Sequence, residues 1–109
     1  MKLLTKKIIE ALPAIRSTEN IPLEKQIVIC KFFTPDSNWT WFAFEGEKIE
    51  DGDFEFWGIV HGLEKEVGYF RLSELEKARG PWGLKVERDK WVFKVPYSSL
   101  VKWPKKPVS

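Results

Sequence analysis

The run of residues 26–33 constrains the fold most strongly, because β-branched and aromatic side chains occupy both of its alternating faces. Successive side chains of an extended chain point to opposite sides. The two faces here are Val28, Cys30 and Phe32 on one side, and Ile27, Ile29 and Phe33 on the other. A strand that is apolar on both sides is typical of the interior of a sheet. The run therefore predicts a central strand.

The residues that follow predict a chain that folds back on itself. Residues 34–38 supply Pro, Asp, Ser and Asn, which favour tight turns, and 39–45 then form a second strand. Further strands are expected at 54–61, 67–72, 84–87 and 91–95. Helices are expected at 6–12, capped by Thr5, and from a capping box between Ser73 and Glu76 to a stop at Gly80-Pro81. The predicted class is α+β: one small domain with a mainly antiparallel sheet of four to six strands and two short helices.

The length of 109 residues suits one compact domain, and the single cysteine, Cys30, excludes an intramolecular disulfide and a multi-cysteine zinc site. No apolar run approaches the roughly 20 residues of a membrane-spanning helix. We therefore expect a protein of a reducing compartment, the cytoplasm, with no membrane partner. The domain is placed at residues 1–97, and the Pro- and Lys-rich residues 98–109 are interpreted as a basic tail.

Charge is distributed unevenly along the chain. The net charge is +3 over residues 1–33, −7 over 34–68 and +6 over 69–109. The acidic centre would attract cations or a basic protein, and the basic last third would favour acidic partners such as nucleic acid. Pairing across neighbouring strands would instead neutralise these charges, and the sequence leaves both interpretations open.

An acidic cluster surrounds the connection after the second expected strand. Its members are Glu45, Glu47, Glu50, Asp51, Asp53 and Glu55. Carboxylates can hold Mg²⁺ or Ca²⁺, but a calcium loop starting at Asp51 needs Gly at its sixth position and Glu at its twelfth. The chain has Phe56 and Gly62 there. Residues 46–53 are therefore interpreted as an exposed acidic loop, and neither a metal nor a cofactor is expected.

The first functional hypothesis is a non-catalytic protein-interaction module that binds through the first hairpin and the acidic loop. The residues that would carry it are Asp36, Asn38, Trp39, Trp41, Asp51 and Asp53. The first two would shape the turn, either indole would anchor a partner protein, and the last two aspartates would attract a basic partner. Alternatively, both indoles fill the core, because a small domain with six Trp and eight Phe needs most of them inside.

A second hypothesis is single-stranded nucleic-acid binding by the basic and aromatic last third of the chain. If residues 90–94 are extended, Lys90 and Lys94 share a face that could follow a phosphate backbone together with Arg88. An edge strand that lysines protect against aggregation would show the same pattern.

A third hypothesis is a small enzyme centred on His61, the only histidine. Acid–base chemistry would require His61 to meet a carboxylate or a nucleophile, for which Asp36, Asp53 and Ser37 are candidates. Nothing in the spacing selects them, and a hydrogen-bonded residue at a strand end explains His61 equally. No catalytic residue is therefore assigned.

Three segments resemble a known family. They are Phe32-Phe33-Thr34-Pro35-Asp36-Ser37-Asn38-Trp39-Thr40-Trp41, Asp51-Gly52-Asp53-Phe54 and Gly68-Tyr69-Phe70-Arg71-Leu72-Ser73-Glu74-Leu75. Over about residues 2–96 the chain is similar to the small bacterial proteins grouped as domain of unknown function 2958, which occur largely on plasmids and integrative elements. The resemblance implies an accessory role in mobile genetic elements and supplies no catalytic residues. The Lys-rich tail after Tyr97 departs from the family pattern.

Overall fold

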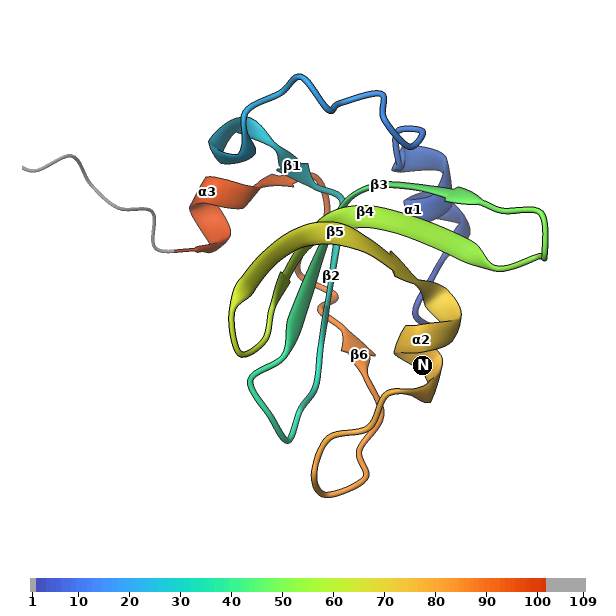
Figure 1. Ribbon diagram of the computed structural model, residues 1–109, viewed down its shortest axis with the longest axis vertical. Helices are drawn as coiled ribbons and strands as arrows, with labels where there is room; N and C mark the ends of the chain where they lie inside the picture. The colour runs from blue at the N-terminus through green and yellow to red at the C-terminus, as the bar shows by residue number, and fades with distance from the viewer. Residues whose placement is uncertain (1, 102–109) are drawn as a thin grey trace, which may run out of the picture.

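The computed structural model describes residues 2–101 and contains a curved antiparallel sheet with helices packed against it (Figure 1). In spatial order the sheet consists of β5 (Lys65–Arg71), β4 (Phe54–His61), β3 (Thr40–Lys48), β2 (Cys30–Phe33) and β6 (Glu87–Arg88). A second sheet pairs β1 (Ile27–Val28) with β7 (Val95–Pro96). The helical segments are α1 (Lys6–Ala11), the 3-10 turn η1 (Leu23–Lys25), α2 (Leu72–Lys77) and α3 (Tyr97–Leu100). The predicted α+β class and mainly antiparallel sheet are confirmed, whereas η1 and α3 were not predicted.

The predicted central strand at 26–33 is divided at Ile29. Its first part, β1, joins the small sheet, and β2 lies between β3 and β6 in the large one. The backbone N–H of Ile29 donates to the carbonyl of Ala43 at 2.9 Å. Ile29 is buried in the same cluster as Cys30 and Phe32, and Val28 is buried in a different one, so the predicted separation of faces is wrong at both residues. The chain changes sheets here, and a period-two pattern does not reveal such a change.

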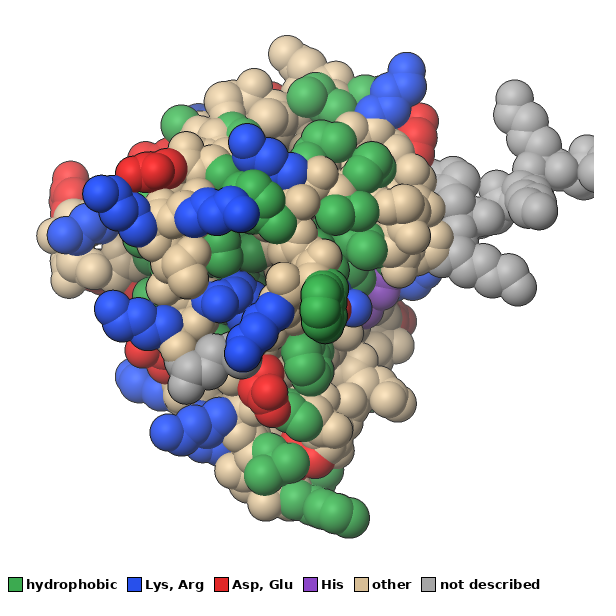
Figure 2. Space-filling model, turned by 180° about the vertical axis from the view of Figure 1, so that it is seen from behind, with side chains coloured by type: hydrophobic (Ala, Val, Ile, Leu, Met, Phe, Trp, Pro, Cys, Tyr) green, Lys and Arg blue, Asp and Glu red, His purple; other side chains and the backbone are tan. Residues whose placement is uncertain are grey.

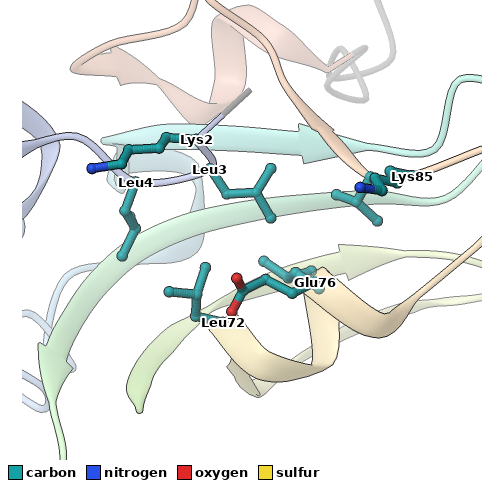
Figure 3. A pocket seen from close by; sticks show the side chains of 8 residues that line it. Lys2, Leu3, Leu4, Leu72, Glu76 and Lys85 are labelled. Carbon is teal, nitrogen blue, oxygen red and sulfur yellow. The ribbon is translucent and has the colours of Figure 1, made fainter. Parts of the chain in front are cut away.

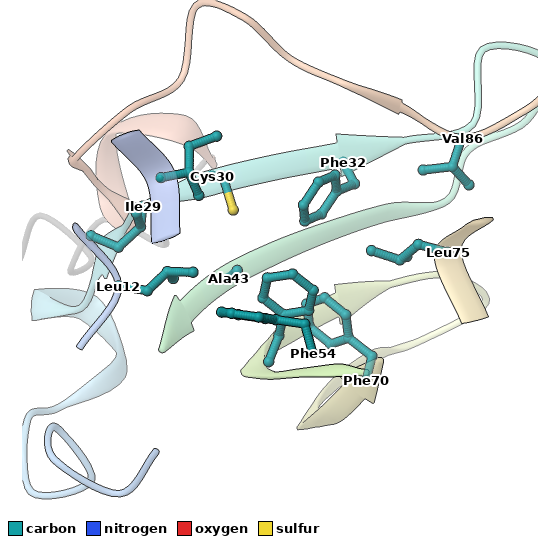
Figure 4. Close-up of a cluster of buried hydrophobic side chains, with 11 residues drawn as sticks. Leu12, Ile29, Cys30, Phe32, Ala43, Phe54, Phe70, Leu75 and Val86 are labelled. Carbon is teal, nitrogen blue, oxygen red and sulfur yellow. The ribbon is translucent and has the colours of Figure 1, made fainter. Parts of the chain in front are cut away.

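Hydrophobic clusters cover both faces of the large sheet. The first lies between the sheet and helices α1 and α2, where Phe32, Phe56 and Leu75 are buried (Figure 4). The second contains Phe42 and Phe44, whose ring centroids lie 5.4 and 5.7 Å from that of Tyr97 in α3. Both faces of the sheet are therefore covered at its centre, whereas the edge strand β5 stays largely exposed.

Strand β3 continues to Lys48, beyond the predicted end at residue 45. Glu45 is only 1% exposed, and its carboxylate accepts the backbone N–H groups of Arg16 and Thr18, each at 2.7 Å. The predicted exposed loop at 46–53 is therefore wrong over 46–48, which belong to the strand. The acidic composition of this segment suggested that its side chains face solvent. Glu45 is instead an internal hydrogen-bond acceptor for the loop that follows α1.

The two predicted helices differ in how well their boundaries were found. In α1 the hydroxyl of Thr5 accepts the N–H of Ile8 at 3.3 Å, so the predicted cap is confirmed. Helix α2 starts at Leu72 and ends at Lys77, before the predicted stop. Its start is closed by Glu74, which accepts the N–H of Arg71 at 3.0 Å, and not by the predicted Ser73–Glu76 box. The reason is that Ser73 donates to a distant residue, Asp53.

The C-terminal strands are shorter than predicted. Between α2 and residue 101, where the described chain ends, the strands are β6 and β7, and residues 90–94 are not a strand. The prediction that Lys90 and Lys94 share a strand face is wrong, because Lys94 has a left-handed backbone (φ 53°) and the chain turns there. Val92 is buried in the second cluster, while Phe93 packs against the first.

The expected tail at 98–109 falls partly within the described chain. Residues 98–100 belong to α3, and residues 102–109, including the run from Trp103 to Pro107, lie outside the described residues. Within residues 2–101, no helix combines the length and the apolar character needed to cross a membrane.

Replacing Glu45 tests its role as an internal acceptor. We expect Glu45→Gln to lower the free energy of unfolding by about 2 kcal/mol, because it weakens a buried acceptor that binds two loop N–H groups. The matched control is Glu47→Gln, since the exposed Glu47 accepts one N–H, that of Ile15 at 2.8 Å, and should cost less than about 1 kcal/mol. Urea unfolding followed by circular dichroism measures both, and equal costs would contradict the assignment.

Candidate functional site

Trp39 directly precedes β3, after the turn of the first hairpin, and 42% of it is exposed. Its ring centroid lies 6.0 Å from that of Trp41, which packs against the first hydrophobic cluster. The indole also lies against Gly62 in the neighbouring hairpin, where a Cβ atom would be 2.5 Å from the ring. The position of Trp39 is therefore fixed from two sides, although much of the indole faces solvent.

Two hollows border this indole. One, of about 350 Å³, lies towards the loop after α2 and is lined by Thr34, Ser37, Trp39, Trp41 and residues 78–81. The other, of about 310 Å³, lies towards the β4–β5 hairpin and is lined by Trp39, Val60, Leu63, Glu64 and Glu66. We call the residues that line the two hollows the Trp39 surface.

Asp36 connects the first hairpin to the loop of residues 79–84. Its Oδ2 accepts the backbone N–H of Trp82 at 2.8 Å and that of Leu84 at 3.4 Å. Its side chain lies against Gly80, where a Cβ atom would be 1.5 Å from Oδ1. Asp36 therefore holds the wall of one hollow in place.

The hairpin turn is closed by Thr34 and Ser37, both within the segment predicted to turn. Thr34 donates its N–H to the carbonyl of Trp39 at 3.1 Å, and its hydroxyl is bonded to that of Ser37. Asn38, which was expected to shape the turn, is exposed within it. Of the predicted binding residues, the structure thus brings together Asp36, Trp39 and Trp41.

Asp51 and Asp53 lie at the opposite end of β3. The nine residues of this strand span roughly 30 Å, so the two aspartates do not border the Trp39 surface. Asp51 is paired with Arg71 at 3.3 Å. Asp53 accepts the N–H and hydroxyl of Ser73. The single surface expected from the sequence, hairpin plus acidic loop, is therefore not formed.

The chain matches the family model described as protein of unknown function (DUF2958) over residues 3–106. It belongs to the DUF2958 family. The resemblance seen in the sequence is thereby confirmed as to the family. No curated protein and no solved structure matches the chain significantly.

In this DUF2958 protein, His61 is not placed beside a carboxylate of the enzyme hypothesis. Its Nε2 is 2.7 Å from the hydroxyl of Tyr97, and its ring lies 4.8 Å from that of Phe42. Partial burial lowers the pKa of His61, and the charges of Lys65 and Lys31 add to this effect. Asp53 precedes the other end of the same strand, β4, and Asp36 bonds to the 79–84 loop.

The remaining candidates for catalysis or metal binding are either buried or too far apart to form a site. Burial raises the pKa of the Cys30 thiol to about 12, which opposes formation of the reactive thiolate. Among residues 2–101, no three His, Cys, Asp or Glu side chains are grouped so that they could hold a metal ion.

The side of the Trp39 surface formed by the β4–β5 hairpin was missed by sequence reasoning. Leu63, Glu64 and Glu66 lie in and after the turn between β4 and β5, and Leu63 is 95% exposed. The one signal for this part of the surface in the sequence is Leu63, an apolar residue within a polar turn. Their proximity to Trp39 depends on the pairing of β3 with β4, which the local pattern does not reveal.

A substitution at Gly80 tests the anchoring of the 79–84 loop. In Gly80→Ala the new methyl group would displace the Asp36 carboxylate from the Trp82 and Leu84 amides. We expect a loss of about 1–2 kcal/mol in the free energy of unfolding. The control is Gly68→Ala, since no atom lies within 4 Å of the added Cβ there. A Gly80→Ala variant as stable as this control would contradict the assignment.

The contact of Asp53 with α2 predicts an acid-dependent contribution to stability. The Ser73 hydroxyl, followed by the Phe54 N–H, lowers the pKa of Asp53 below its ordinary value of 3.8. As the pH falls, the Asp53 carboxylate is therefore protonated in the unfolded state before it is protonated in the folded state. Its contribution to the free energy of unfolding is present above pH 3.8 and is lost as the pH falls through the pKa of the folded state. Asp53→Asn should flatten the decline of stability below this pH in urea unfolding, whereas an unchanged decline would contradict it.

Proposed function

We propose that the protein is a non-catalytic protein-interaction module that docks a partner on the Trp39 surface. The observation that carries this proposal is the half-exposed indole, fixed against Gly62 and Trp41 between two hollows. Tryptophans held in this way are common energetic centres of protein interfaces, because they bury a large area and lose little conformational freedom on binding.

The charges around the indole favour a basic and apolar partner segment. Glu64 and Glu66 border the hollow on one side of Trp39, so a Lys or Arg side chain could lie over the ring and close to both carboxylates. The hollow on the other side, walled by Trp41 and Pro81, suits an apolar side chain. These two glutamates take the role that the sequence suggested for Asp51 and Asp53.

The hydrogen bonds of His61 favour this proposal over the enzyme hypothesis. Its Nε2 is held by the Tyr97 hydroxyl, and neither predicted carboxylate partner is among its contacts. The mobile-element setting implied by the family resemblance and the cytoplasmic location stay predictions of the sequence.

Selection from a phage-displayed library of random 12-residue peptides tests the proposal. We expect enriched peptides with Lys or Arg next to apolar residues, which bind the wild-type protein and quench its tryptophan fluorescence. Trp39→Ala should weaken a selected peptide at least tenfold, as expected for an interface anchor worth about 1.4 kcal/mol or more. Glu64→Gln/Glu66→Gln should weaken it less and reduce the salt dependence of binding.

Trp91→Ala is the matched control, because Trp91 is 93% exposed and does not border either hollow. Circular dichroism should show that every variant is folded. The proposal is wrong if no peptide is enriched, or if Trp39→Ala and Trp91→Ala bind the selected peptides equally well.

A further inference from the structure

A second surface, separate from the Trp39 surface, gathers positive charge. Figure 2 shows Lys and Arg side chains concentrated over one side of the molecule. The lysines of this surface come from the N-terminal segment and from the region around β6. We call them the basic face, and they are Lys2, Lys7, Lys85, Lys90 and Lys94. All five are exposed.

Contacts between the two ends of the described chain bring these lysines together. The Arg88 guanidinium in β6 donates to the carbonyls of Lys2 and Leu3, the latter at 3.1 Å. The ammonium groups of Lys7 and Lys94 lie 4.3 and 5.5 Å from the centre of the Phe93 ring. The basic face is therefore held by tertiary contacts and is not a run of charge along one strand.

A hollow of about 380 Å³ opens between the N-terminal segment and α2 (Figure 3). Lys2 and Lys85 lie at its rim, and leucines such as Leu3 and Leu72 form its walls. Glu76 is the one acidic residue that lines it. Two ammonium groups at the edge of one hollow favour a ligand with negative charge.

The lysines of the basic face are not engaged in ion pairs within the described chain, although Glu76, Glu87 and Asp89 line the hollows beside them. Among residues 2–101, none of the five forms an ion pair, whereas the neighbouring Asp89 is paired with Lys31 at 3.6 Å. Other acidic side chains, such as Glu45 and Asp53, are bonded to backbone N–H groups elsewhere in the fold. The net charge of the whole chain is only +2, but the charge is unevenly distributed and this surface is basic.

An exposed aromatic ring lies beside this charge. Trp91 lines a second hollow of about 380 Å³ together with Phe33, Arg88, Lys90 and two acidic residues, Glu87 and Asp89, of which Asp89 is paired with Lys31. A flat ring open to solvent next to cations suits a strand that carries both phosphates and unpaired bases, because bases stack on aromatic side chains while phosphates contact lysines. In a duplex the bases are already stacked on one another, so none of them is available to stack on Trp91.

From this arrangement we infer that the basic face binds the phosphate backbone of single-stranded nucleic acid, with a base stacked on Trp91. The site differs from the strand face suggested by the sequence, because Lys2, Lys7 and Lys85 contribute to it and residues 90–94 are not extended. It is also independent of the Trp39 surface, so either proposal can fail without the other.

Fluorescence anisotropy with a labelled 20-nucleotide oligothymidine tests the site. Phosphate contacts by five lysines predict a fall in affinity of about a hundredfold between 50 and 200 mM salt, from a slope of roughly 0.7 per contact for single strands. Lys7→Ala/Lys94→Ala should weaken binding at least tenfold at 50 mM salt and reduce this slope by about 1.4. Lys25→Ala/Lys65→Ala removes the same charge from η1 and the start of β5, and should leave both quantities nearly unchanged.

A duplex of the same length and Trp91→Ala distinguish base stacking from charge alone. We expect Trp91→Ala to weaken the single strand at least fivefold and the duplex hardly at all, since stacking on an aromatic ring requires an unpaired base. Absence of binding at 50 mM salt, or equal weakening by the two double variants, overturns the site. Binding to the duplex as tight as to the single strand overturns the single-stranded assignment.

Discussion

Hydrogen bonds from backbone N–H groups to buried or half-buried carboxylates determine where the loops of this fold lie. Glu45 binds the amides of the loop after α1, Asp53 binds the start of α2, and Asp36 binds the loop of residues 79–84. Loop amides need acceptors when a fold removes them from water, and a carboxylate is the strongest acceptor among the side chains. Each bond joins residues at least 20 positions apart in the chain. The curved sheet is therefore the frame, and its acidic side chains attach the other segments to it.

This use of the acidic residues determines the character of the surface. Because Glu45 and Asp53 are engaged internally, they do not balance the lysines that collect near β6 and the N-terminal segment, and one side of the molecule is basic. The loop that Asp36 holds completes a hollow beside Trp39 at another place on the molecule. The two surfaces have different chemistry, one aromatic with a glutamate rim and one rich in lysine.

Local patterns in the sequence predicted those parts of the fold that depend on local physics. Strand β4 has the predicted limits, Phe54–His61, and Thr5 caps α1 as expected. Glu45 was placed at the end of the second strand and counted with an acidic cluster interpreted as solvated, and only a partner 29 residues away shows that its carboxylate is an internal acceptor. The sequence also could not separate the two indoles of the hairpin, since the distinction depends on Gly62, which accommodates the ring of Trp39, and on the core that covers Trp41.

Amide hydrogen exchange measured by NMR at neutral pH tests most directly whether carboxylates hold these loops. The N–H groups of Arg16, Thr18 and Trp82 lie outside helices and strands, and each is bonded to a carboxylate. We predict that they exchange about as slowly as the amides of the β3–β4 ladder, because they open only when the carboxylate contacts break. Exchange at the rate of an unstructured loop would show that the carboxylates do not hold these segments, and would contradict the account.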